Sequence, residues 1–140
     1  MSIRADLLTY LATKTSVTAL VSARIYSQQA PEGADLPRVI FTELGGERTG
    51  SLSGANAQIK TSFALECQAA SGAGSVAVAD ALANVLDYFQ GTMGSSTVQG
   101  VFVTNVGDSI EPPVAANEDA IHSSTLNIDL WYESTVPTYV

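Results

Sequence analysis

Basic residues are scarce in this chain, and they form no cluster. Six Lys and Arg residues stand against fourteen Asp and Glu residues, which gives a net charge of −8 at pH 7. Affinity for nucleic acids comes mainly from Lys and Arg side chains that displace counterions from phosphates. The charge balance therefore argues against a nucleic-acid-binding protein and indicates an acidic, well-solvated surface.

Cysteine and histidine occur once each, at Cys67 and His122. One cysteine excludes an intrachain disulfide and a clustered-thiol zinc site, and one histidine excludes a His-rich metal site or a histidine dyad. We expect Cys67 to be an inert thiol in the core and His122 to be an ordinary polar residue at the start of a strand. No metal or other cofactor is expected, and this cysteine usage is typical of the cytosol.

Long uncharged hydrophobic runs are also missing, and the chain meets Asp6 before any apolar run. We therefore expect neither a signal peptide nor a transmembrane helix, and no membrane partner. The chain is nevertheless 46% hydrophobic and only 14% charged, which predicts a folded domain with part of its surface covered by partners. We expect one domain over residues 1–133 and a loose C-terminal tail over residues 134–140.

Hydrophobic periodicity predicts two helices and four main strands. Apolar residues at helical spacing predict helices over residues 3–14 and 75–90. The spacing over residues 17–21 is compatible with one further helical turn. Alternating or β-branched runs predict strands over residues 39–44, 59–68, 98–106 and 123–132. The order predicts an α+β fold with a four-stranded, mostly antiparallel sheet and two helices packed on one face.

A glycine-rich corner at Gly72–Ala77 matches the G-x-G-x-x-A form of a dinucleotide loop. The acidic residue that should follow about 20 residues later is missing, and so are the further βα units of a doubly wound sheet. The favoured interpretation is a tight strand-to-helix turn, with Ser75 as a candidate N-cap and Gly72 or Gly74 at positive φ. Paired acids such as Glu118 and Asp119 lie in a polar, proline-bearing segment where nothing would tune their pKa values, so catalysis is not expected.

Read in order, several short segments resemble the tail-completion (tail-terminator, head–tail joining) family of long-tailed bacteriophages, prophages and gene transfer agents. The resemblance covers about residues 3–133. The segments are the N-terminal helix, Arg24-Ile25-Tyr26, Leu36-Pro37-Arg38-Val39-Ile40, the alternating strand over 59–68, the helix with Leu82 and Leu86, and Leu126-Asn127-Ile128-Asp129-Leu130-Trp131. One departure is the Gly/Ala-rich stretch over residues 70–76, where the family often has bulkier residues.

The resemblance implies a non-enzymatic structural virion protein, made in the bacterial cytoplasm, that forms a ring, usually a hexamer, on the tail tube. Its implied partners are other copies of itself, the tail tube protein and the head–tail connector or stopper, and DNA passes through the bore without specific binding. The alternatives are another neck or minor tail component of similar fold and a small nucleotide- or metabolite-binding domain with a deep pocket near Gly72–Ala77.

Two segments, Gly45–Ala57 and Gly107–Ala120, are predicted to be loops that are flexible in isolation and become ordered against a partner. They contain the candidate partner-binding residues Glu47, Arg48, Thr49, Ser51, Leu52, Asn56, Asp108, Glu111, Glu118 and Asp119. Six copies would carry a charge of about −48, and acids facing a bore would repel DNA phosphates. The candidates for acids that face the bore are Glu47, Glu66, Asp108, Glu111, Glu118 and Asp119.

Overall fold

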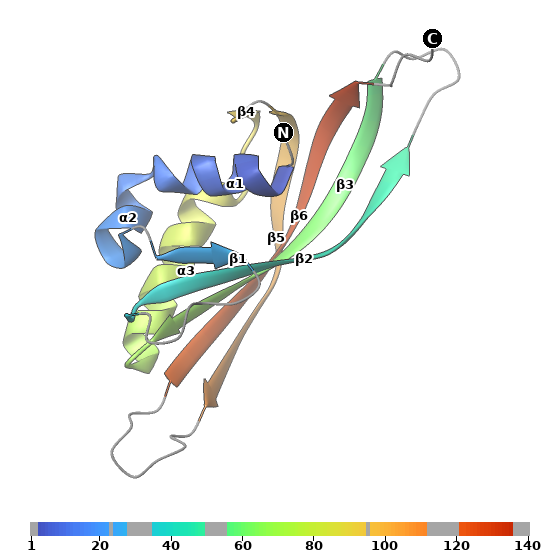
Figure 1. Ribbon diagram of the computed structural model, residues 1–140. Helices are drawn as coiled ribbons and strands as arrows, with labels where there is room; N and C mark the ends of the chain where they lie inside the picture. The colour runs from blue at the N-terminus through green and yellow to red at the C-terminus, as the bar shows by residue number, and fades with distance from the viewer. Residues whose placement is uncertain are drawn as a thin grey trace.

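In the part of the chain that the structure describes, a long, curled sheet of six strands carries three helices on one of its faces (Figure 1). This computed structural model describes residues 3–22, 24–27, 35–49, 56–94, 96–111 and 121–135. The elements are α1 (Ile3–Ala12), α2 (Thr15–Val21), β1 (Ile25–Ser27), β2 (Arg38–Thr49), β3 (Asn56–Ala69), α3 (Gly72–Leu86), β4 (Gly91–Met93), β5 (Ser96–Glu111) and β6 (Ile121–Thr135). The strand order is β1-β2-β3-β6-β5-β4.

The predicted four-stranded sheet with two helices is wrong in number and in class, because the described chain is mainly β. The sheet is mixed, since β1 runs parallel to β2 while the other neighbours are antiparallel. The two additional strands, β1 and β4, have three residues each, which is too short for an alternating pattern to appear in a sequence. The third helix, α2, follows Lys14, whose extended backbone (φ −92°, ψ 108°) separates it from α1.

The main strands are also longer than the sequence indicates. Residues Gly45–Thr49, predicted as loop, continue β2 past a bulge at Glu43/Gly45, and Asn56–Ala57 begin β3. Gly107–Glu111, also predicted as loop, continue β5. These extensions were missed because glycine and polar residues interrupt the alternation there, while cross-strand backbone pairing does not depend on side-chain type. β6 runs to Thr135, and residues 136–140 of the predicted tail lie outside the described residues.

The glycine-rich corner is a tight turn into α3, but its details differ from the prediction. The N-cap is Ser71, whose Oγ accepts a hydrogen bond from Gly74 N at 3.1 Å, and Ser75 lies inside the helix. Positive φ occurs at neither Gly72 nor Gly74. A β-carbon on Gly74 would lie 3.2 Å from Ala69 Cβ, so close packing explains the small residue.

The C-terminal end of α3 also differs from the predicted helix over 75–90. The helix ends at Leu86 and Tyr88 at φ 62° turns the chain, whereas Gly91 and Gly94 lie further along. Both glycines have positive φ, but they belong to β4 and to the turn after it. Phe89, inside the predicted range, lies beyond the helix, and the centre of its ring is 4.6 Å from that of Tyr10.

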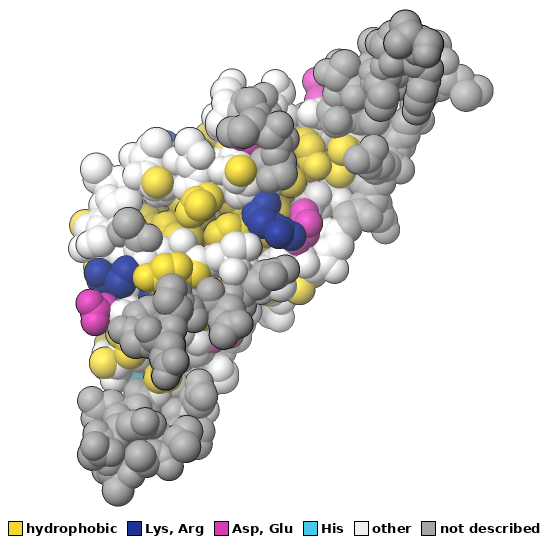
Figure 2. Space-filling view, in the orientation of Figure 1, with side chains coloured by type: hydrophobic (Ala, Val, Ile, Leu, Met, Phe, Trp, Pro, Cys, Tyr) yellow, Lys and Arg dark blue, Asp and Glu magenta, His cyan; other side chains and the backbone are white. Residues whose placement is uncertain are grey.

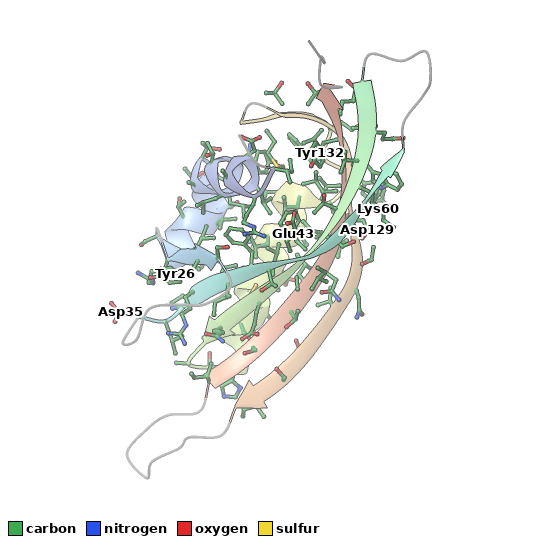
Figure 3. The ribbon with its side chains drawn as sticks, turned by 45° about the vertical axis from the view of Figure 1, so that its right-hand side comes forward. Tyr26, Asp35, Glu43, Lys60, Asp129 and Tyr132 are labelled. Atoms are coloured by element: carbon green, nitrogen blue, oxygen red, sulfur yellow. The ribbon has the colours of Figure 1, made fainter. Side chains whose placement is uncertain are left out.

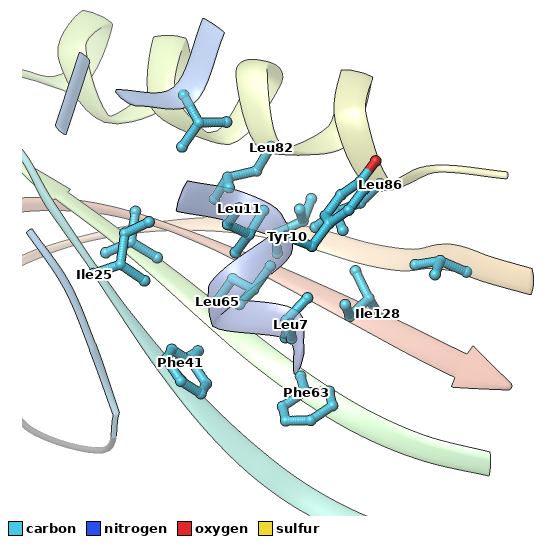
Figure 4. Close-up of a cluster of buried hydrophobic side chains, with 14 of the residues drawn as sticks. Leu7, Tyr10, Leu11, Ile25, Phe41, Phe63, Leu65, Leu82, Leu86 and Ile128 are labelled. Carbon is cyan, nitrogen blue, oxygen red and sulfur yellow. The ribbon is translucent and has the colours of Figure 1, made fainter. Parts of the chain in front are cut away.

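The core lies between the helices and the inner face of the sheet (Figure 4). Phe63 and Leu65 of β3 and Ile128 of β6 are fully buried beneath helix residues such as Leu7 and Leu82. The strands predicted over residues 59–68 and 123–132 thus direct alternate side chains into the core. The Tyr10 hydroxyl donates to Val85 O at 2.5 Å, and Arg4 Nη2 lies 3.1 Å from Glu43 Oε1, so polar contacts join α1 to both α3 and β2.

The helices are much shorter than the strands that they cover. At about 1.5 Å per residue α3 spans roughly 22 Å, whereas the 15 residues of β6 span about 50 Å. As a result, β2, β3 and β6 extend well beyond the helices at one end of the sheet, and β5 and β6 form the opposite end (Figure 1).

The turn after β4 depends on a close approach between Gly94 and the buried Asp6. Gly94 has φ 60°, and a β-carbon there would overlap Asp6 Oδ1 and lie 2.8 Å from Asp6 Cγ. Asp6 is fully buried in α1. The contact therefore ties the first helix to the edge of the sheet.

We predict that Gly94→Ala lowers the free energy of unfolding by about 2 kcal/mol or more, because alanine disfavours this backbone and its methyl group collides with Asp6. Gly107→Ala is the matched control, since a β-carbon at Gly107 meets nothing within 4 Å, and it should change stability by less than about 0.5 kcal/mol. Urea denaturation followed by circular dichroism measures both. Equal stabilities for the two variants would contradict this description of the turn.

Candidate interaction surfaces

The outer face of the sheet carries no helix among the described residues, and polar side chains cover it. At its centre Lys60 Nζ lies 3.6 Å from Asp129 Oδ2 (Figure 3), and it lies 5.6 Å from the centre of the Trp131 ring. Ser62 Oγ donates to Asp129 Oδ1 at 2.7 Å. Each of these residues comes from β3 or β6, so the contacts join the two central strands across the uncovered face.

Amide side chains continue this polar surface in both directions. Toward one end Gln58 Nε2 donates to Gln99 Oε1 at 2.6 Å, and Gln99 Nε2 donates to Glu133 Oε1 at 2.8 Å. An open hollow of about 300 Å³ lies beside them, lined also by Gly100, Phe102 and Trp131.

Toward the other end the polar network is centred on Glu66. Arg38 Nε donates to Gln68 Oε1 at 2.5 Å, and Gln68 Nε2 donates to Glu66 Oε2. Ser123 Oγ also donates to Glu66, at 3.4 Å. Paired charges and mutually bonded amides of this kind suit contact with a protein surface better than acid–base chemistry.

The helix-covered side shows no concentration of one charge either. Figure 2 shows hydrophobic side chains gathered over the helices, with the few basic and acidic side chains standing singly or in pairs. Within the described ranges no three His, Cys, Asp or Glu side chains come together in a way that could hold a metal ion. None of the described helices is long and apolar enough to span a membrane.

The candidate partner-binding residues that the structure describes lie at the two opposite ends of the sheet. Glu47, Arg48 and Thr49 end β2 and Asn56 begins β3, whereas Asp108 and Glu111 lie near the end of β5. The fold of a single chain therefore does not bring the two groups together. Ser51, Leu52, Glu118 and Asp119 lie outside the described residues.

The α3 N-terminus at the glycine-rich corner is occupied by the protein's own side chains. Ser75 Oγ lies 3.1 Å from Ser124 Oγ, and Ser124 donates to Asp108 Oδ1 at 2.8 Å. His122 is close by, with its Nδ1 3.7 Å from where a β-carbon on Gly72 would lie. A carboxylate near the helix N-terminus is favourable for the helix but would repel a pyrophosphate.

Sequence reasoning missed the outer face as a surface in its own right. The signal was present, because the alternation over residues 123–132 assigns Asn127, Asp129 and Trp131 to the face opposite the core. Trp131 is half-buried there without a helix over it. A large aromatic residue in such a position is typical of a protein interface.

Comparison with known proteins identifies matches that cover most of the chain. A family model described as tail completion protein gp17 matches residues 5–133. Among solved structures 23 chains match, including a chain from the virion of a native gene transfer agent (GTA) particle, with a TM-score of 0.67 and 15% sequence identity over 95% of this chain and 96% of that chain. At this identity the likeness shows the fold. No curated protein sequence matches.

We predict that Cys67 is unreactive in the folded protein. Its side chain is fully buried, and burial, aided by the neighbouring Glu66 carboxylate, raises its thiol pKa to about 12. Because the thiolate is the nucleophile, an aromatic disulfide reagent at pH 8 should label Cys67 only after unfolding in denaturant. The variant Thr97→Cys adds an exposed thiol that should react within minutes without denaturant. Rapid labelling of the native wild-type thiol would contradict its burial.

Proposed function

Because the chain belongs to the tail completion protein gp17 family, a family of structural virion proteins, we propose that it forms a ring that terminates the tail tube. The ring is a hexamer that stops growth of the tube and joins the tail to the head connector. It acts by shape-matched binding, without chemistry and without a cofactor.

The observation that carries this proposal is the one-sided covering of the sheet. Among the described residues, the helices cover the middle of the inner face, while no described element covers the outer face or the two ends of the sheet. A ring subunit on a tube needs contacts to two neighbouring copies, to the tube below and to the connector above. An elongated sheet with two separate ends and an uncovered face provides those contacts with ordinary residues.

We assign the partner contacts to the two ends of the sheet. Glu47, Arg48, Thr49, Ser51, Leu52 and Asn56 form one group, around the β2–β3 connection, and Asp108, Glu111, Glu118 and Asp119 form the other, around the β5–β6 connection. The two groups meet the tube protein, the connector or a neighbouring copy.

The acidic balance of the chain fits a channel for DNA. Six copies carry a charge of about −48, and acidic residues toward the bore would repel phosphates, so DNA would pass without sticking. Paired acids such as Asp129, which lies against Lys60, contribute less to this repulsion than unpaired ones would.

Deletion of the gene for this protein, in a bacterial strain that produces the particles, tests the proposal. We predict tails longer than normal, or tails that fail to join heads, in electron micrographs of the deletion strain. A plasmid copy of the wild-type gene should restore tail length, and native mass spectrometry of protein released from tails should give a hexamer. Tails of normal length joined to heads in the deletion strain would contradict a terminating role.

A further inference from the structure

Both outer edges of the sheet are protected at one end and open at the other. β1 pairs with β2 only over Val39–Phe41, and β4 pairs with β5 only over Ser96–Val98. Past these contacts no described strand pairs with the outer side of β2 over Glu43–Thr49 or of β5 over Asn105–Glu111. We call these the β2 open segment and the β5 open segment.

Short polar contacts extend the protection of β5 up to its open segment. The backbone N–H of Tyr88 donates to Val101 O at 2.7 Å, and the backbone N–H of Val103 donates to Asp87 Oδ1 at 3.1 Å. Val101 and Val103 thus direct their backbone groups toward the edge. After the bulge at Val103/Asn105, the strand alternation directs Val106, Asp108 and Ile110 the same way.

The β2 open segment has the same arrangement. The backbone N–H of Val39 donates to Arg24 O at 2.9 Å, so Val39 faces the edge. Alternation then brings Glu43 to the edge, and after the bulge at Glu43/Gly45 it brings Gly46 and Arg48 there. Each open segment therefore offers a row of backbone donors and acceptors to another strand.

The most exposed large aliphatic side chains of the described chain lie on these same two segments. Leu44 on β2 is 59% exposed, and Val106 and Ile110 on β5 are 55% and 58% exposed, whereas the next such residue, Val76, is 42% exposed. Edges that remain free in solution usually carry charged residues, proline or a covering element, and these two segments carry exposed apolar residues beside charged ones such as Glu43 and Asp108. Apolar residues on an open edge indicate that the edge is covered in the assembled state.

We propose that the β2 open segment of one copy pairs, antiparallel, with the β5 open segment of the next copy. Three antiparallel steps separate β2 from β5 within one sheet, so the two strands run in opposite directions. A neighbouring copy with its helices on the same side therefore presents β5 antiparallel to β2. Each copy contributes one segment of each kind, as a head-to-tail ring requires. This inference rests on the ring of the proposed function and specifies its subunit contact.

The protected ends fix how neighbouring copies are displaced. Gly46 pairs with Thr61 of β3. Asp108 pairs with Ser124 of β6, which in turn pairs with Cys67 of β3. Thr61 and Cys67 are six residues apart along β3. Bringing the two open segments together thus displaces adjacent copies by about 20 Å along the strands. Closed barrels require such a stagger, because their strands tilt relative to the barrel axis. β1 and β4 block pairing without the stagger.

Disulfide trapping tests the contact. If Gly46 of one copy pairs with Asp108 of the next, Glu47 lies directly opposite Gly107. Both residues direct their backbone groups into their own sheets. They therefore form a non-hydrogen-bonded pair with Cα atoms about 4.5 Å apart, close enough for a disulfide. We expect Glu47→Cys combined with Gly107→Cys to give crosslinked ladders up to the closed ring under oxidation, in tails and in concentrated protein. Two further double variants, Glu47→Cys with Asn105→Cys and Glu47→Cys with Ser109→Cys, test registers shifted by two residues in either direction.

The control pair is Glu47→Cys with Thr97→Cys, in which Thr97 is exposed but pairs with β4, and it should form no ladder. Native Cys67 is buried and does not interfere. Absence of crosslinks in all three registers, in both samples, would overturn the edge contact. If the deletion strain nevertheless makes tails of abnormal length, the proposed function stands while this inference fails. Crosslinked rings, together with tails of normal length in the deletion strain, would support the edge contact and contradict the terminating role.

A second pair of variants removes the contact without relying on disulfide geometry. Val106→Lys and Ile110→Lys place charges on an exposed open edge, and we expect at least a tenfold loss of rings on tails with an unchanged unfolding midpoint. Val76→Lys, an exposed aliphatic position on α3, should leave ring formation unchanged. Normal rings from both edge variants would overturn the proposal.

Discussion

Apolar packing of α1 and α3 against the inner face of β3 and β6 is the constraint on which the rest of the structure depends. It requires Leu7, Leu82, Phe63 and Ile128 to be buried together, and so fixes which face of each strand points inward. Helices rise about 1.5 Å per residue and strands about 3.3 Å, so helices of this length cannot cover strands of 14 to 16 residues. An uncovered face and uncovered strand ends follow directly from that packing.

The uncovered regions are stabilised in different ways, and the difference has functional meaning. The outer face carries bonded polar groups such as Lys60 with Asp129 and Gln58 with Gln99, so it is compatible with water as well as with a partner. The open edges carry the aliphatic side chains of Leu44, Val106 and Ile110, whose exposure to water is unfavourable. Under the proposed function, the open edges are the contacts between copies, and the outer face is left for the tube, the connector or the bore.

The sequence was sufficient to predict the amphipathic elements, in which one face is apolar and buried and the other is polar. The strand over 59–68, the strand over 123–132 and the stripe of Val78, Leu82 and Leu86 were predicted for this reason, and so was membership of the tail-completion family, which depended on the order of these segments. β1, β4 and the ends of β2 and β5 were not predictable in this way. They are held by backbone pairing, by the Asp6–Gly94 contact and by Tyr88 at positive φ, none of which leaves a periodic pattern. Of the candidate site residues, the described ones lie around the strand connections, although several belong to strands and not to loops.

A reconstruction of the tail end of intact particles by electron cryomicroscopy, at a resolution that separates β-strands, tests the central claim most directly. The account predicts six copies of this chain around the end of the tube, with β2 of each copy hydrogen-bonded to β5 of the next and with the helices outside the shared sheet contact. Copies joined through their helices, with both sheet edges facing solvent, would contradict it.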